Sequence, residues 1–295
     1  MRIAVTGSSG LIGAALTSAL QDAGHDVLHI VRRAPTGRHD VQWDLDAGLI
    51  DADALVGVEA IVHLAGENIG QRWSDDVRRR VLDSRVDGTR LIAETAAGLA
   101  SRPVLICASA TGFYGDRGDE IVDEDSVPGT GFLAEVVEAW EAAAEPARAA
   151  GLRTVHLRQG IVLAKGGGAL ARLLPPFKLG AGGRVGSGRQ WWSWVSLDDT
   201  VAAYLFALEQ PLAGPVNVVA PGVVTNQEFV KALGRALHRP AFFPLPASAV
   251  KAAFGEMGEE MLLAGQRVAP TRLVAAGFPF GQPDIDSGFA SALAS

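Results

Sequence analysis

Three glycines near the start of the chain are the residues best placed to do chemistry. Gly7, Gly10 and Gly13 follow the apolar run at residues 2–6 and open a helical pattern at residues 11–23. A glycine-rich turn between a buried strand and a helix lets the backbone approach a pyrophosphate, whose charge the helix N-terminus stabilises. The GxxGxxG spacing also fits a purely structural turn. We predict a nucleotide cradle in which the cofactor contacts Gly7, Ser9, Gly10, Leu11, Ile12 and Gly13.

The second predicted strand, at residues 26–33, indicates which dinucleotide would bind. An NAD site carries an acidic residue near the end of this strand, where it binds the ribose 2′-hydroxyl. This strand ends instead in Arg32 and Arg33, whose guanidinium groups suit a phosphate monoester. The sequence therefore favours NADP, although a solvated basic strand end is the alternative interpretation.

The elements that must position these residues alternate along the chain. Near-continuous apolar runs, typical of strands buried on both faces, lie at residues 3–6, 27–31, 60–64, 104–108 and 154–157. Helical patterns lie between them, the longest running from Ser74 as N-cap to about Ala100. This order predicts an α/β fold with a Rossmann-type, doubly wound parallel sheet.

Two parts of the chain are expected to differ in role. Residues 1–160 should form the dinucleotide-binding core, and residues 161–295 a mixed substrate region with a small C-terminal α/β domain. Elements at about 195–220 should return to the core. Eight glycines in residues 166–188 predict a mobile loop around a short helix at residues 169–174.

Composition limits the partners. A net charge of −7 over 295 residues argues against nucleic acid or an anionic membrane, and favours a small-molecule substrate. Cys107 is the only cysteine, so an internal disulfide cannot form, and the histidines show no metal-site spacing. No signal peptide pattern and no run of about 18 apolar residues occurs, so a cytoplasmic location is expected.

Several motifs together resemble those of the extended short-chain dehydrogenase/reductases. They are VTGSSGLIG at residues 5–13, HLAG at 63–66, Ser109 with Tyr114 and Gly115, Leu157 with Arg158, and WVSLDD at 194–199. GRQWWSW at 188–194 and RLVAAGF at 272–278 are similar to an atypical, NAD(P)-dependent epimerase/dehydratase-like subgroup with a C-terminal domain of unknown function. The resemblance implies an NADP-type cofactor that contacts Leu64, Ala65, Gly66, Ser109 and Arg158, with Asp44 at the adenine. It also implies a possible homodimer through the helices at residues 74–100 and 132–149.

One departure from this family affects the chemistry. Its Tyr-x-x-x-Lys pair lowers the tyrosine pKa for proton transfer, but Tyr114 and Tyr204 are followed four places later by Gly118 and Leu208. Two explanations stay open. In the first, the chain is an NADP-dependent oxidoreductase or epimerase whose proton donor is Tyr114, together with Ser109, or a carboxylate of Glu67, Asp116 or Glu124. In the second, it is a catalytically silent NADP-binding sensor or scaffold.

A cluster of tryptophans and arginines suggests where a substrate would bind. Trp191, Trp192 and Trp194 lie within four residues, next to Arg184 and Arg189. Alternate positions of a strand face opposite sides, so one face should be core while the other could meet a ligand. We expect a small anionic or sugar-nucleotide-like substrate against Glu67, Asn68, Arg184, Arg189 and Trp192.

Overall fold

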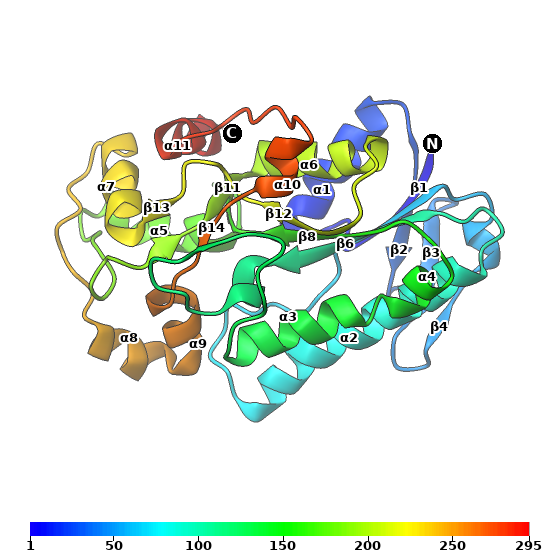
Figure 1. Ribbon diagram of the computed structural model, residues 1–295, viewed down its shortest axis with the longest axis horizontal. Coiled ribbons are helices and arrows are strands. Elements are labelled where there is room, and N and C mark those ends of the chain that lie inside the picture. The colour runs from blue at the N-terminus through cyan, green and yellow to red at the C-terminus, as the bar shows by residue number, and fades with distance from the viewer. Residues whose placement is uncertain (295) are drawn as a thin grey trace.

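A single large sheet forms the centre of the computed structural model, which describes residues 1–294 (Figure 1). Its eight strands lie in the order β12-β8-β6-β5-β1-β2-β3-β4, and all neighbours are parallel except β3 and β4. The strands are β1 (Arg2–Thr6), β2 (Asp26–Val31), β3 (Asp40–Asp44), β4 (Leu49–Ile50), β5 (Ala60–His63), β6 (Val104–Ala110), β8 (Thr154–Gln159) and β12 (Gly214–Val218). The order reverses beside β1, which confirms the predicted Rossmann-type, doubly wound sheet.

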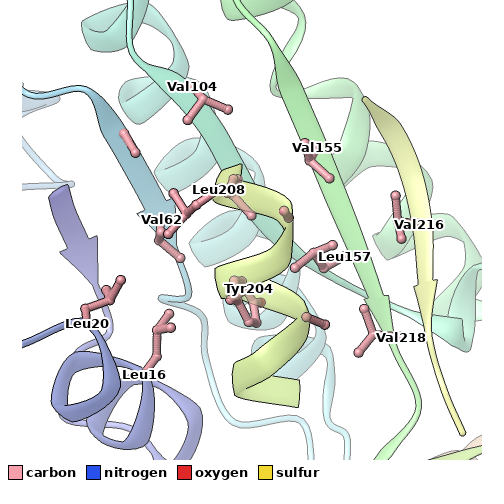
Figure 2. Packing of buried hydrophobic residues seen from close by; sticks show 14 of the residues in the cluster. Leu16, Leu20, Val62, Val104, Val155, Leu157, Tyr204, Leu208, Val216 and Val218 are labelled. Atoms are coloured by element: carbon pink, nitrogen blue, oxygen red, sulfur yellow. The ribbon is translucent and has the colours of Figure 1, made fainter. Parts of the chain in front are cut away.

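Helices cover both faces of this sheet (Figure 1). One face carries α1 (Leu11–Asp22) and α6 (Leu197–Glu209), and the other carries α2 (Asp75–Gly98), α3 (Phe132–Ala142) and α4 (Glu145–Ala149). Figure 2 shows the first interface, where side chains of α1 and α6 meet the apolar faces of the central strands. The contacting residues include Leu16, Leu20, Tyr204, Leu208, Val62, Val104, Val155 and Leu157. Continuous apolar strands are required because both faces are covered.

The longest helix begins where its sequence predicts. The Ser74 hydroxyl accepts a hydrogen bond from the backbone N–H of Val77, and Asp75 and Asp76 lie in the first turn of α2. An N-cap oxygen and first-turn carboxylates both stabilise a helix N-terminus. This start directs α2 beneath β5 and β6, where Ile92, Ala93 and Ala96 are buried.

The later part of the chain gathers at one end of the molecule (left in Figure 1). The helices at this end are α5 (Gly168–Lys178), α7 (Asn226–Ala236), α8 (Ala247–Phe254), α9 (Glu256–Gly258) and α11 (Ile285–Ala294), whereas α10 (Thr271–Ala275) packs against β12 of the central sheet. Short strand pairs join it to the core: β9 (Ile161–Leu163) with β11 (Trp194–Ser196), β10 (Trp191–Trp192) with β13 (Val224–Thr225), and β7 (Ile121–Val122) with β14 (Arg267–Val268). Single helical turns complete the chain: η1 (Asp53–Leu55), η2 (Thr111–Tyr114) and the π-turn η3 (Glu259–Leu263).

The glycine-rich stretch is more ordered than its composition suggests. Helix α5 runs over Gly168–Lys178, so the expected short helix at 169–174 is too short. The Arg172 guanidinium donates a hydrogen bond to the carbonyl of Gly70, which ties α5 to the loop after β5. Gly167 lies against the Leu11 side chain at the start of α1. The stretch therefore packs against the start of α1 and the loop after β5.

No helix within residues 1–294 is both long and apolar enough to cross a bilayer.

Candidate functional site

The turn from β1 into α1 is built on close backbone contacts. Gly7 has a φ of +66°, and a Cβ there would lie 2.9 Å from the Leu64 carbonyl carbon. A Cβ on Gly13 would lie only 2.1 Å from the Gly7 carbonyl oxygen. Gly10 caps α1, and its N–H donates to the Gly7 carbonyl at 2.9 Å. Only glycine permits this left-handed turn and this helix–strand distance.

The turn opens onto a cavity of about 510 Å³ at the carboxyl ends of β1, β2 and β5. We call it the cradle cavity. Of the predicted cofactor residues, those lining it are Gly7, Ser9, Gly10, Arg32, Arg33, Leu64, Ala65 and Gly66. The lining also includes Glu67, predicted for the substrate, and residues that the sequence did not single out: Ser8, Ile30, Val31, Trp43, Leu45 and Ser84. Ligands of open α/β sheets bind at this reversal of strand order.

The two arginines at the end of β2 differ in whether their side chains are already bound to other residues. Arg33 donates to the Asp40 carboxylate at 2.8 Å and to the Thr36 hydroxyl at 3.0 Å. The Thr36 backbone N–H and Arg33 together hold the pKa of the Asp40 carboxyl well below its usual range. Among residues 1–294, by contrast, the Arg32 side chain has no hydrogen-bond or ion-pair partner. Arg32 is therefore the guanidinium available to a ligand at this rim.

Asp44, expected at the adenine, does not line the cradle cavity. It is exposed, and its carboxylate accepts hydrogen bonds from the N–H groups of Asp46 and Ala47. Trp43 and Leu45 line the cavity on either side of it in sequence. Strand alternation points the side chain of Asp44 away from the face that Trp43 occupies.

Leu11, Ile12 and Gly13 support the cradle cavity without lining it. Gly13 is buried against Gly7, and Ile12 packs on the core cluster beneath the sheet. Leu11 contacts Gly167. Their role in the structure is to fix the position of α1.

A buried polar pair lies directly beneath the turn. The Thr6 hydroxyl accepts hydrogen bonds from the N–H groups of Leu64 and Ala65, at 2.9 and 3.1 Å. It also lies 2.8 Å from Nδ1 of His63, which is fully buried. Burial, reinforced by the charge of Arg85, lowers the pKa of His63 to about 4. This contact network fixes the ends of β1 and β5 relative to each other.

Ser109 and Arg158, which the resemblance places at the cofactor, belong to a buried ion-pair network. The Ser109 hydroxyl donates to the Glu141 carboxylate of α3 at 2.6 Å. Arg158 donates to both oxygens of the same carboxylate, at 2.8 and 2.7 Å. Ser109 and Arg158 are both 3 % exposed. Neither side chain reaches the cradle cavity, because both point beneath α3.

Tyr114 extends this network and is also buried away from solvent. Its side chain is 0 % exposed. The phenol donates to Oδ1 of Asn217 at 2.7 Å and accepts from Arg158 at 3.1 Å. Burial raises the pKa of Tyr114 to about 12, although Arg158 opposes the shift. Tyr114, which the sequence suggested as a proton donor, thus directs its hydroxyl proton to Asn217 inside the protein.

A second cavity, of about 320 Å³, lies beyond the carboxyl end of β6. We call it the interdomain cavity, because η2 and α3 form one wall and the segment at residues 251–266 forms the other. Its lining comprises Gly112, Gly115, Asp116, Thr130, Leu133, Lys251, Glu259, Glu260, Leu263, Ala264 and Gln266. The sequence offered no signal for this wall, since it lies more than 100 residues after α3.

The other predicted substrate residues lie outside the interdomain cavity. Trp192 is 4 % exposed and packs edge-on against Phe229, so it belongs to the core, which corrects its predicted role. Asn68 accepts from the N–H of Gly70 in a turn. Arg184 donates to the carbonyl of Ser187 within its own loop.

Arg189 lines a separate depression of about 330 Å³ together with Asp119, Gly188, Thr225, Gln227, Glu228 and Lys231. The structure thus does not bring Arg184, Arg189 and Trp192 together around one ligand.

We predict that His63 stays neutral until pH falls to about 4. Because its folded-state pKa lies below the value of 6.5 for an exposed histidine, the unfolded chain binds the proton first. His63 therefore reduces the free energy of unfolding as pH falls from 6.5 towards 4. A histidine NMR titration, with urea-unfolded protein as the control, checks this. A His63 resonance that titrates near pH 6.5 in the folded protein would contradict the described burial.

We predict that Tyr114→Phe lowers the free energy of unfolding by about 1–3 kcal/mol, because Asn217 and Arg158 lose a buried partner. The same variant should leave nucleotide affinity unchanged, because Tyr114 lies outside the cradle cavity. Urea denaturation and calorimetry measure the two effects, and Ser109→Ala is the matched variant at the other end of the network. Weakened nucleotide binding with an unchanged free energy of unfolding would show that Tyr114 acts at the nucleotide site and not in the buried network.

Comparison with known proteins supports the same fold and family. Residues 3–220 match the model of the NAD dependent epimerase/dehydratase family, and residues 245–292 match a domain of unknown function, DUF1731. An epimerase family protein of Mycobacterium tuberculosis is 49 % identical over 94 % of this chain and 93 % of its own length. Human epimerase family protein SDR39U1 is 39 % identical over 97 % of each chain.

Two solved structures are also similar. Human SDR39U1, crystallised with NADPH, superposes with a TM-score of 0.89 at 35 % identity and covers all of both chains. A nucleoside-diphosphate sugar epimerase from Corynebacterium glutamicum superposes with a TM-score of 0.82 at 37 % identity, over 99 % of this chain and 58 % of that one. The chain therefore belongs to the NAD dependent epimerase/dehydratase family and carries a C-terminal DUF1731 domain.

Proposed function

We propose that this protein binds NADPH in the cradle cavity and uses it in a reduction or epimerisation of a small polar molecule held in the interdomain cavity. The observation that carries the proposal is the unpaired Arg32 guanidinium at the rim of the glycine turn. The NADPH-bound structure of human SDR39U1, similar over the whole chain, supports it.

The residues of the cradle cavity fit such a cofactor. A Cβ on Gly10 would meet only the Gly7 carbonyl, at 3.2 Å, so the mouth of the turn leaves space for a phosphate beside the N-terminus of α1. Trp43 and Leu45 would hold the adenine, Arg32 the 2′-phosphate, and the backbone at residues 8–10 the pyrophosphate. When bound, the cofactor supplies or accepts a hydride.

The proton chemistry differs from that of ordinary family members. The helix that would carry the Tyr-x-x-x-Lys pair is apolar at its start, and its Leu133 lines the interdomain cavity. Of the three carboxylates considered from the sequence, Glu124 is buried and accepts from the N–H groups of Asn217 and Arg272, whereas Glu67 lines the cradle cavity. Asp116 lines the interdomain cavity. We assign Asp116 as the group that exchanges a proton there.

Cofactor binding without turnover is the second candidate function. It is favoured by the burial of both tyrosines, Tyr114 and Tyr204, whose phenols are hydrogen-bonded inside the protein. Burial raises the pKa of each phenol above its usual range. NADPH-oxidation assays on purified protein separate the candidates, because a sensor would bind NADPH without oxidising it in the presence of any substrate.

We predict that Arg32→Ala weakens NADPH binding by about ten- to a hundredfold and leaves NADH affinity nearly unchanged, since charge-assisted hydrogen bonds contribute roughly 1.5–3 kcal/mol. Arg33→Ala is the matched control and should have a smaller effect, because that guanidinium is bound to Asp40. Calorimetry with both dinucleotides measures the ratio. Equal affinity of the wild type for NADPH and NADH would refute the assigned role of Arg32.

A further inference from the structure

The interdomain cavity has walls that are fixed by specific contacts. The Glu260 carboxylate accepts hydrogen bonds from the N–H groups of Phe132 and Leu133, at 2.8 Å each, and so caps α3. On the same segment, Glu256 pairs with Arg78 of α2 at 2.5 Å. Two distant parts of the chain therefore enclose one preformed space.

A second set of contacts joins the two walls of this cavity. The N–H of Gly265 donates to the Asp116 carboxylate at 3.3 Å, and its carbonyl accepts from the N–H of Arg117 at 3.2 Å. The loop after η2 is thereby bound to the C-terminal segment, so lining groups from both walls face the same ligand.

The charges around the interdomain cavity are predominantly negative. Its lining includes three carboxylates, Asp116, Glu259 and Glu260, and one ammonium group, Lys251. Lys251 lies 3.2 Å from Glu259 and is neutralised by it. The N-terminus of α3 offsets Glu260, which leaves Asp116 without an opposing side-chain charge among the lining residues. A phosphate here would meet carboxylates and no arginine within the described lining.

The size and polar groups of the cavity restrict its ligand further. About 320 Å³ is at the lower end of the range for small-molecule sites, and a nucleoside diphosphate sugar needs much more room. Within residues 1–294, the hydroxyl of Thr130 and the side-chain amide of Gln266 have no hydrogen-bond partner, so both can bind a ligand hydroxyl. Leu133, Leu263 and Ala264 supply an apolar surface.

We propose that the interdomain cavity takes a compact, phosphate-free molecule with ammonium and hydroxyl groups, and rejects sugar nucleotides. This rests on the proposed function, because it names the substrate class for the interdomain cavity. Hydrogen-bond donors of the ligand face the carboxylate of Asp116. The anionic substrate expected from the tryptophan–arginine cluster is replaced, since that cluster lies outside the cavity.

A matched series of sugars tests the proposal on the NADPH-saturated protein. Glucosamine, glucose and glucose 6-phosphate have similar rings but carry positive, zero and negative charge, and UDP-glucose represents sugar nucleotides. We expect glucosamine to bind about fivefold more tightly than glucose, the ratio that a solvent-accessible ion pair supports, and the two phosphorylated ligands not to bind detectably. Chemical-shift changes at Thr130 and Gln266 report occupancy of the cavity.

A pair of variants tests whether a carboxylate of the interdomain cavity causes the preference for glucosamine over glucose. Asp116→Asn should abolish the preference for glucosamine over glucose, whereas Glu138→Gln, an exposed carboxylate on α3 outside the cavity, should preserve it. Failure of glucosamine to bind, or binding of glucose 6-phosphate or UDP-glucose at least as tightly, would overturn the proposal. NADPH binding, followed in the same samples, reports separately on the proposed function and would survive that failure.

Discussion

The structure depends on how closely β1, α1 and β5 approach one another. Gly13 lies against the Gly7 carbonyl, Gly7 against the backbone of Leu64, and the Thr6 hydroxyl binds the N–H groups that follow β5. No side chain fits between these segments. The same constraint exposes the N–H groups at the start of α1 and places Leu64, Ala65 and Gly66 across the cavity from them. The cradle cavity is thus a consequence of backbone packing before any functional side chain contributes.

The buried polar network under α3 explains why a relative of the short-chain dehydrogenase/reductases can lack the usual tyrosine and lysine. Glu141 and Arg158 bind each other with two hydrogen bonds, and they bind Ser109 and Tyr114 as well. Breaking a buried ion pair at one partner is costly, typically about 3–5 kcal/mol. These side chains therefore serve to join β6, β8 and α3. In the function proposed above, the proton is exchanged by Asp116 on the wall of the interdomain cavity, whose other wall belongs to the C-terminal domain.

Much of the fold could be predicted from local sequence. The five strands β1, β2, β5, β6 and β8 coincide with the apolar runs of the sequence, and Ser74 has the side chain that an N-cap requires, so the pattern and the structure agree there. The cradle glycines were also predictable, because a positive φ and a 2.1 Å approach leave no other residue type. These features depend on contacts close in sequence or on backbone geometry alone.

The parts that sequence reasoning placed wrongly depend on distant contacts. Alternation assigns Trp192 and Trp191 to opposite faces of a strand, but only the packing of α7 decides that Trp192 is the buried one. Trp43 lines the cradle cavity because β3 pairs with β2, and the alternation along β3 does not tell from the sequence which of its side chains meets a cavity. The interdomain cavity combines Leu133 with Glu260. These residues are 127 positions apart in the sequence, and a hydrogen bond at the start of α3 joins them. No local pattern encodes that pairing.

A crystal structure of the complex with NADPH tests the central claim most directly. The account predicts the pyrophosphate at the backbone of residues 8–10, and the 2′-phosphate within hydrogen-bond distance of the Arg32 guanidinium. Arg33 should remain on Asp40. A cofactor bound elsewhere, or a 2′-phosphate directed away from Arg32 into solvent, would contradict the account.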